Sequence, residues 1–374
     1  LPTVVVRAMM LDRAITFLKG RSGVSPAVIE QLVYFLNKGI HPTVPEHGGV
    51  GASGDLTQLA HMGLGLIGEG TAEYRGERRP VANILREQGR APLQLELRDG
   101  LAIVNGTACM TGYGLINVHH AQELLDRAIG MGALLCEVAG AYDDHLSEAL
   151  NSAKLHRGQQ LVAARMREAL EGSTLSRKRE AHWHANGHGR NGDRFGEKVQ
   201  EHYSIRCIPQ ILGPIADAID SARTVLLNEL HSVDDNPIVD HERGSVYHGG
   251  NFHGDQVSLE MDKLRLALVK MSVLCERQLN YLMNDRLNQR FPAFLNMGRP
   301  GLDYGLQGMQ YTATSTTAEN QALSTSLYVH SIPNNNDNQD VVSMGTNSAL
   351  MTARVVQNTA QVMAVLAVAL AQAV

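Results

Sequence analysis

The apolar pattern of residues 264–283 constrains the fold more than any other feature of the sequence. Within "LRLALVKMSVLCERQLNYLM", apolar side chains recur at steps of four and three residues: Leu264, Leu268, Met271, Cys275, Leu279 and Leu282. This spacing draws one apolar stripe along a long helix, and the stripe must pack on another helix. Similar patterns predict helices at 117–138, 159–171, 210–231, 313–328 and 343–373. The sequence therefore predicts a mainly α protein, a bundle of long antiparallel helices with loops at one end.

Signals for β-strands are few, and no internal repeat is visible. The stretch "IVDHERGSVYHG" (238–249) predicts a small β-hairpin with a glycine turn, and short segments near 74–80 are expected to pair. We expect residues 1–374 to form a single helical domain. Its opening, "LPTVVVRAMM", and its end within a helical pattern indicate a chain cut at both ends.

Composition and charge narrow the classes of partner. The 33 basic and 38 acidic residues are intermixed and give a formal charge of −5, so no nucleic-acid partner is expected. The four cysteines are far apart and form no CxxC pair, which argues against disulfides and zinc and favours a cytoplasmic location. Polar residues interrupt the apolar C-terminal stretch before it reaches the ~20 residues that a bilayer requires. A buried core helix is expected there, and no membrane.

One segment, "REAHWHANGHGRNGDRFGEK" (179–198), lacks any apolar period and is rich in Gly, Asn, His and charge. This composition predicts a mobile surface loop. His182, His184 and His188 could in principle bind a metal, but no Cys or carboxylate stands at a matching spacing. A solvated loop without a metal is the favoured interpretation.

Five polar islands interrupt the helical pattern, and loops of this kind often carry chemistry. They are "GGVGASGDL" (48–56), "NGT" (105–107), "QEHYSIRCIPQ" (200–210), "GGNFHG" (249–254) and "NNNDNQDVVSMG" (334–345). In the third island, Gln200, Tyr203 and Arg206 step by three, which would place them on one side of a helical turn. Taken singly, each island is also compatible with an ordinary turn or with surface hydrogen bonding.

Taken together and in this order, the islands resemble the family of histidine, phenylalanine and tyrosine ammonia-lyases and aminomutases. The resemblance covers nearly the whole chain, and it includes "YSIRCIPQILG", "DDNPIV" and "NQDVVSMG". It implies that the islands are active-site loops at one end of the bundle. The same resemblance implies a homotetramer whose active sites combine residues of more than one subunit.

In that family an Ala-Ser-Gly tripeptide cyclises into 4-methylideneimidazol-5-one, a built-in electrophile, with no external cofactor. The resemblance assigns this role to Ala52, Ser53 and Gly54. The amide nitrogen of Gly54 would attack the carbonyl carbon of Ala52, and two waters would leave, one of them taking the Ser53 hydroxyl. A bulkier residue at position 54 would hinder that attack. The plain alternative is a tight turn before a helix that begins near Asp55.

The other site residues follow from the same resemblance. Arg206 would bind the substrate carboxylate, and Asn105 would help to hold carboxylate and amine. Tyr203 and Gln200 would lie beside the prosthetic group, with Tyr203 assisting proton transfer. The remaining two positions are Phe252, which would pack near the prosthetic group, and Gln339, which would lie by the substrate amine. The family's catalytic base, a tyrosine on an N-terminal loop, would precede Leu1.

The substrate is expected to be an aromatic amino acid, most of all tyrosine. Histidine-specific members have a glutamate in "NQED" where this chain has Gln339, and "GMQYTATSTTAEN" (308–320) resembles tyrosine ammonia-lyases and tyrosine 2,3-aminomutases. The product would be an arylacrylate, or the β-amino acid if the ammonia returns. Two alternatives remain: a histidine ammonia-lyase that gives urocanate, and a non-catalytic helical scaffold. The fumarase class also has long helices, but its "GSSxMPxKxN"-type loop is missing here.

Overall fold

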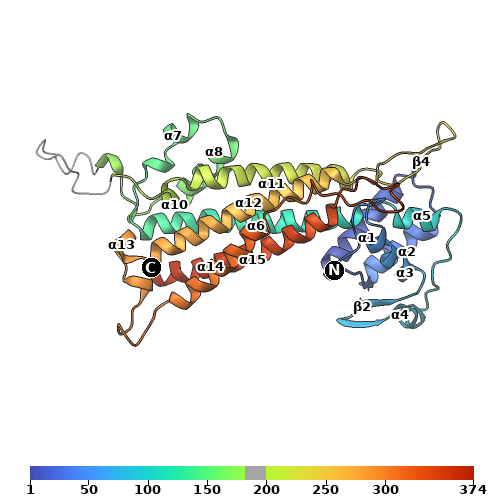
Figure 1. The fold of residues 1–374 in the computed structure, drawn as a ribbon, viewed down its shortest axis with the longest axis horizontal. Coiled ribbons are helices and arrows are strands. Elements are labelled where there is room, and N and C mark those ends of the chain that lie inside the picture. Colours follow the sequence, from blue (N-terminus) through green and yellow to red (C-terminus); the bar gives the residue numbers. More distant parts are fainter. Residues whose placement is uncertain (182–198) are drawn as a thin grey trace, which may run out of the picture. The chain divides into compact units, whose positions relative to one another are not determined.

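The computed structural model describes residues 1–181 and 199–374, which separate into two compact units. The first unit comprises Leu1–His119, Ser221–Lys263 and Thr325–Ala353. The second comprises the described parts of His120–Asp220 together with Leu264–Ser324 and Arg354–Val374. Most of the loop predicted at 179–198, with its three histidines, lies outside the described residues. The chain is mainly helical, as predicted, with two small antiparallel sheets (Figure 1).

Five N-terminal helices of the first unit surround one apolar core. They are α1 (Thr3–Leu18), α2 (Pro26–Lys38), α3 (Leu56–Leu66), α4 (Val81–Glu87) and α5 (Asp99–Val104). Figure 1 shows α1, α2 and α3 grouped together. Phe17, Leu32, Phe35 and Met62 fill the space between them and are almost completely buried. Burial of such aliphatic and aromatic side chains is the main source of stability for this part of the chain.

Both sheets belong to the first unit. Strand β1 (His41–Pro42) pairs with β2 (Thr71–Tyr74), which pairs with β3 (Glu77–Pro80) through a turn in which Arg75 and Gly76 have positive φ. The hairpin predicted at 238–249 is confirmed: β4 (Ile238–Asp240) pairs with β5 (Ser245–Tyr247). The pairing predicted near 74–80 is confirmed as well.

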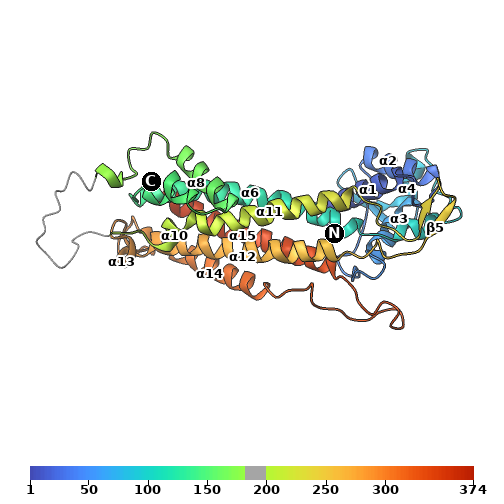
Figure 2. The same cartoon turned by 90° about the horizontal axis from the view of Figure 1, so that it is seen from above.

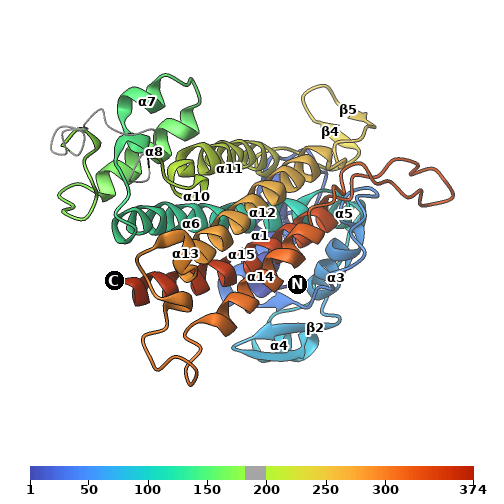
Figure 3. The ribbon, with the colours of Figure 1, turned by 60° about the vertical axis from the view of Figure 1, so that its left-hand side comes forward.

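Four long helices contribute residues to both units. They are α6 (Ala108–Val138), α11 (Ile208–Leu230), α12 (Asp255–Met283) and α15 (Gly345–Ala373). In the first unit, the N-terminal parts of α12 and α15 run parallel. Ser348 and Thr352 of α15 donate hydrogen bonds to the carbonyl oxygens of Ser258 and Met261, at 3.2 and 2.9 Å. Figures 2 and 3 show these two helices side by side.

In the second unit, α12 packs against α14 (Gln307–Ala322) in the antiparallel direction. The hydroxyl oxygens of Ser272 and Thr317 lie 3.2 Å apart, and Thr314 donates to Glu276 at 3.3 Å. All six residues of the apolar stripe predicted on α12 are buried. The shorter helices of this unit are α7 (Glu148–Ser152), α8 (Arg157–Ala169), α10 (Tyr203–Arg206) and α13 (Asp285–Asn288), with 3₁₀ turns η1 (Asp144–Leu146) and η2 (Ala293–Leu295).

The helix predicted at 313–328 ends earlier, at Ala322. The carboxylate of Asp262 accounts for the difference, because it accepts hydrogen bonds from the Ser326 hydroxyl and from the backbone nitrogens of Leu327 and Tyr328 at 2.7–2.9 Å. These bonds satisfy the backbone N–H groups of residues 327 and 328 without a helix.

In the described part of the chain, α15 is apolar and long enough to cross a membrane, and 56% of its apolar window is buried. A packed core helix meets the same criterion.

Candidate active site

The tripeptide Ala52-Ser53-Gly54 follows a loop whose backbone is held in unusual conformations. Ser53 has a φ of 54°, in the left-handed region that few side chains adopt, and Gly51 and Gly54 have φ of 84° and 82°. Helix α3 begins directly afterwards, at Leu56, with Asp55 as its N-cap residue. The tripeptide is therefore a strained turn at the start of a helix, and only glycine fits readily on its two sides.

Gly106 of the "NGT" island clamps this turn from one side. Its carbonyl oxygen accepts the backbone N–H of Asp55 at 2.8 Å, and its own N–H donates to the carbonyl oxygen of Ser53 at 3.3 Å. A Cβ atom on Gly54 would collide with the carbonyl oxygen of Gly106. The backbone of residue 54 is bare because another backbone segment lies against it.

The side chain of Asp55 anchors the turn to two helices. One carboxylate oxygen accepts the N–H of Met110 in the first turn of α6 at 2.8 Å, and the other accepts the Thr346 hydroxyl at the start of α15. Complete burial raises the pKa of Asp55 from 3.8 to about 7, although these hydrogen bonds act in the opposite direction. The first unit thus holds a carboxyl group that can exchange a proton near neutral pH, directly beside the tripeptide.

The "NQDVVSMG" island covers the other side of the tripeptide. The N–H of Met344 donates to the carbonyl oxygen of Val50 at 3.0 Å, and Ala52 packs against Val342 and Met344. The amide nitrogen of Gln339 donates to the hydroxyl oxygen of Ser53 at 3.1 Å. The structure thus brings together Gln339 and the tripeptide, two predicted parts of the site.

Asn105 and Thr107, on either side of Gly106, are fixed by the segment 234–236. The side-chain oxygen of Asn105 accepts the N–H of Asn236 at 2.8 Å. The N–H of Thr107 donates to the carboxylate of Asp234 at 2.6 Å. Phe252, predicted to pack near the site, is half-buried in the turn before α12 in the same unit.

The three residues of the third island lie in the second unit. Tyr203 and Arg206 are the first and last residues of α10, a single turn, with the Arg206 guanidinium 4.7 Å from the centre of the Tyr203 ring. Gln200 lies before this helix and is exposed, so the prediction of one helical turn for all three was wrong for Gln200. The backbone between Gln200 and Tyr203 is extended at His202, with φ of −59° and ψ of 154°.

Two features of Tyr203 and Arg206 bear on ligand binding. Tyr203 is 69% exposed, which is unusual for a large aromatic side chain. The Nε atom of Arg206 is buried without a hydrogen-bond partner among the described residues. A buried guanidinium N–H without an acceptor is costly, and an anionic ligand would satisfy it.

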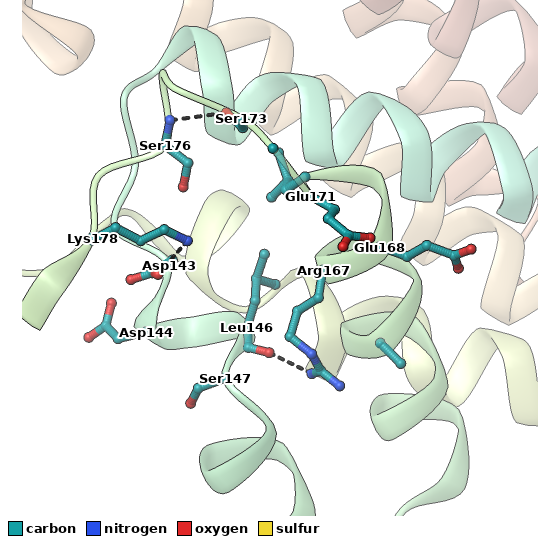
Figure 4. Close-up of a pocket in the computed structure, with 13 residues that line it drawn as sticks. Asp143, Asp144, Leu146, Ser147, Arg167, Glu168, Glu171, Ser173, Ser176 and Lys178 are labelled. Atoms are coloured by element: carbon teal, nitrogen blue, oxygen red, sulfur yellow. Dashed lines mark hydrogen bonds and ion pairs between the residues drawn. The ribbon is translucent and has the colours of Figure 1, made fainter.

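The second unit also contains a cavity of about 700 Å³ between η1, α8 and the following loop (Figure 4). Three of its charged side chains contact neighbours: Lys178 pairs with Asp143 at 3.1 Å, and Arg167 donates to the carbonyl oxygen of Leu146 at 2.7 Å. None of the predicted site residues lines this cavity. We therefore place the candidate active site at the tripeptide rather than at this cavity.

The sequence did not predict three buried polar residues that lie close to the site: Asp55, Asp234 and Arg13, the last of which pairs with Asp234 at 2.7 Å. Asp234 stands in "DDNPIV", a motif that carried the resemblance but received no role, and Arg13 lies within an ordinary helical pattern. The sequence pattern around Asp55 predicts only the start of a helix. The signal for Asp234 was the pair of acids directly before Asn-Pro, and Arg13 gave no signal in the sequence.

Comparisons with known proteins agree with the resemblance. The family model described as aromatic amino acid lyase matches residues 1–374. Tyrosine ammonia-lyase of Cupriavidus metallidurans is 41% identical over 98% of this chain and 70% of its own, and the MIO-dependent tyrosine 2,3-aminomutase of Streptomyces globisporus is 41% identical over 98% and 69%. Histidine ammonia-lyase of Geobacillus kaustophilus is 40% identical over 99% and 70%. The crystal structure of tyrosine aminomutase from Streptomyces globisporus superimposes with a TM-score of 0.94 at 38% identity, over 99% of this chain and 70% of that one.

Proposed function

The chain belongs to the aromatic amino acid lyase family, and from this membership we propose that it removes ammonia from an aromatic L-amino acid, with tyrosine as the expected substrate. Members of the family are ammonia-lyases and aminomutases, so the protein is a carbon–nitrogen lyase or an isomerase. The observation that carries the proposal is the arrangement around Ser53, which is held by the Gly106 N–H on its carbonyl oxygen and by Gln339 on its hydroxyl.

We propose that Ala52, Ser53 and Gly54 form the 4-methylideneimidazol-5-one group that gives MIO-dependent relatives their name. A bond would form between the Gly54 nitrogen and the Ala52 carbonyl carbon, with loss of the carbonyl oxygen and of the Ser53 hydroxyl as two waters. The positive φ of Ser53 and the absence of a Cβ on Gly54 fit such a ring closure. When formed, the group supplies an electrophile that captures the amine and makes it a better leaving group.

Arg206 would bind the carboxylate of the substrate. Its Nε lacks a partner among the described residues, and a guanidinium binds carboxylates through parallel hydrogen bonds. Asn105 would contribute a further donor, because Asn236 already occupies its side-chain oxygen and so directs the amide nitrogen elsewhere. These two residues would orient the amino acid before its β-proton is removed.

Gln339 would lie beside the substrate amine and favour a phenyl or phenol ring over an imidazole. A neutral amide carries no charge to attract an imidazolium, whereas an unpaired glutamate beside a phenol ring would be costly to bury. Phe252 adds an aromatic surface in the same unit. Tyr203 would assist proton transfer, and Gln200 would hydrogen-bond near the prosthetic group.

We further propose a cytoplasmic homotetramer in which a site takes residues from more than one subunit. Large apolar side chains of the second unit stand exposed in the isolated chain, among them Met297, Leu302 and Tyr304, each more than 70% exposed. Exposed apolar surface of this kind favours association, and symmetric assembly is the usual outcome. Tyr203 and Arg206 would then serve a tripeptide of another subunit.

Two measurements test the proposal. Mass spectrometry of the peptide that contains residues 52–54 should give a mass lower by two waters. Incubation with tyrosine, phenylalanine and histidine in separate reactions should give p-coumarate from tyrosine fastest, with arylacrylate followed by absorbance and β-amino acid by chromatography. Faster formation of urocanate from histidine would overturn the choice of substrate. Accumulation of β-tyrosine ahead of coumarate would identify the protein as an aminomutase. An unmodified tripeptide in an inactive protein would favour the alternative of a non-catalytic helical scaffold.

A further inference from the structure

A buried ion pair lies directly behind the "NGT" island. Nη1 of Arg13 is 2.7 Å from one carboxylate oxygen of Asp234, and both side chains are at most 3% exposed. Arg13 is fixed further by a 2.7 Å hydrogen bond from Nη2 to the carbonyl oxygen of Ala102, and its guanidinium lies 4.5 Å from the centre of the Phe17 ring. Burying two charges costs much of what their attraction returns, so stability alone is a weak reason for such a pair.

The second oxygen of Asp234 is turned toward Thr107. It accepts the backbone N–H of Thr107 at 2.6 Å. The Thr107 hydroxyl also lies 3.0 Å from this oxygen, but it is closer to the carboxylate of Glu229, at 2.6 Å, so the backbone N–H is the bond that ties Thr107 to Asp234. The first oxygen thus accepts from Arg13 and, at 3.3 Å, from the Thr16 hydroxyl, and the second faces the backbone of a loop. Hydrogen bonds to a charged acceptor are among the strongest in proteins, so the position of Thr107 follows that of Asp234.

Gly106 transmits this position to the tripeptide. A Cβ on Gly106 would lie 2.5 Å from Nη1 of Arg13 and 2.7 Å from an oxygen of Asp234, so the ion pair packs directly against its Cα. On its other side, Gly106 holds the carbonyl of Ser53 and the N–H of Asp55. A chain of consecutive contacts thus runs from Arg13 through Asp234, Thr107 and Gly106 to Ser53, whose φ is strained.

We infer that Asp234, held by Arg13, is a positioning residue that fixes the conformation in which Ala52-Ser53-Gly54 cyclises. The inference rests on the proposed function, because it concerns formation of the same prosthetic group. Asp234 does not touch the atoms that react. It acts through Thr107 and Gly106, which keep the Ser53 carbonyl and the following N–H in place while the Gly54 nitrogen approaches the Ala52 carbonyl carbon.

The test follows the loss of two waters in time, by mass spectrometry of the 52–54 peptide after cell-free synthesis. Asp234→Asn keeps the shape but loses the charge, and we expect cyclisation about tenfold to a hundredfold slower, the effect of one weakened charge-assisted bond. Ile84→Ala, in the buried core of α4 in the same unit, is the matched control for general destabilisation. Thermal unfolding of both variants shows whether they are equally destabilised.

A second pair of variants covers the case in which Asp234→Asn does not fold. Thr107→Val removes, at constant volume, the hydroxyl that contacts both Glu229 and Asp234, and it should slow cyclisation. Thr107→Ser keeps the hydroxyl and should keep the rate. Equal slowing in Ile84→Ala and Asp234→Asn at equal loss of thermal stability would overturn the inference, as would normal cyclisation in Asp234→Asn. An unmodified tripeptide in the unaltered protein would instead refute the proposed function.

Discussion

Gln339 donates a hydrogen bond from its amide nitrogen to the Ser53 hydroxyl over 3.1 Å, although 286 positions separate the two residues in the chain. In the proposed maturation, this hydroxyl would leave as water in the dehydration that gives the exocyclic methylene. A donor directed at this oxygen stabilises the charge that develops on it as the C–O bond breaks. In the proposed function, the same side chain thus contacts the group that would leave during maturation and would later face the substrate amine.

Replacement of Gln339 by Glu should slow both formation of the prosthetic group and turnover of tyrosine. An ionised carboxylate has no proton to donate to Ser53, and the loss of one such bond corresponds to roughly tenfold in rate. Peptide mass and coumarate absorbance measure the two effects. The control is Asn338→Asp, which makes the same chemical change at an exposed neighbour. If Gln339→Glu cyclises and turns over tyrosine as fast as this control, the contact has no catalytic importance.

Substitution of Gly54 by Ala should abolish the loss of two waters. The added Cβ would meet the carbonyl oxygen of Gly106, and the φ of 82° is itself unfavourable for alanine. Gly70→Ala is a matched control, because Gly70 also has a positive φ, of 68°, but its Cβ would meet nothing within 4 Å. This control should lose only about 1 kcal/mol in free energy of unfolding and keep its cyclised tripeptide. Normal cyclisation in Gly54→Ala would contradict the clamp by Gly106.

The buried carboxyl of Asp55 should make stability depend on pH. Its pKa rises from 3.8 to about 7 on folding, so the folded chain binds more protons between these values and its stability falls as pH rises from about 4 to 7. Asp55→Asn lacks this effect. The free energy of unfolding of the variant, relative to the unaltered protein, should therefore increase across this window by an amount on the order of 4 kcal/mol. Urea unfolding at several pH values measures it, and a constant difference would show that Asp55 does not titrate there.

Replacement of Arg206 by Lys should raise KM for tyrosine more than it lowers kcat. A lysine keeps the positive charge but cannot form two parallel hydrogen bonds to a carboxylate, which corresponds to about tenfold to a hundredfold in binding. Arg165→Lys, at an exposed ion pair with Asp126 in the same unit, should leave KM unchanged. An unchanged KM in Arg206→Lys would remove Arg206 from the carboxylate site.

The helical part of the fold could be predicted because each long helix carries its own apolar period. Leu268 and Leu279 are buried where the stripe on α12 places them. The hairpin of β4 and β5 was predictable from its strand pattern and glycine turn. Helix ends were harder, since the end of α14 depends on the carboxylate of Asp262, which is distant in the sequence and captures residues 326–328.

The sequence predicted the residues of the candidate site but not the buried residues that hold them in place. The tripeptide and Gln339 stand in recognisable islands, and the structure brings them together. Arg13 and Asp234, by contrast, are 221 positions apart, and no local period marks a residue whose role is to hold a distant loop. The single helical turn expected for Gln200, Tyr203 and Arg206 failed because steps of three suit several conformations, and His202 is extended.

The bond between Thr346 and the carboxylate of Asp55 has a consequence for the time at which the tripeptide acquires its surroundings. The two residues are 291 positions apart, and the bond between Met344 and Val50 spans a comparable length of chain. A nascent chain on the ribosome carries residues 52–54 long before it carries their partners. If cyclisation requires these partners, the tripeptide would stay an ordinary peptide during synthesis, without an electrophile that cellular amines and thiols could attack. Chemical maturation of the chain would thus report that its far segments have been made and correctly folded.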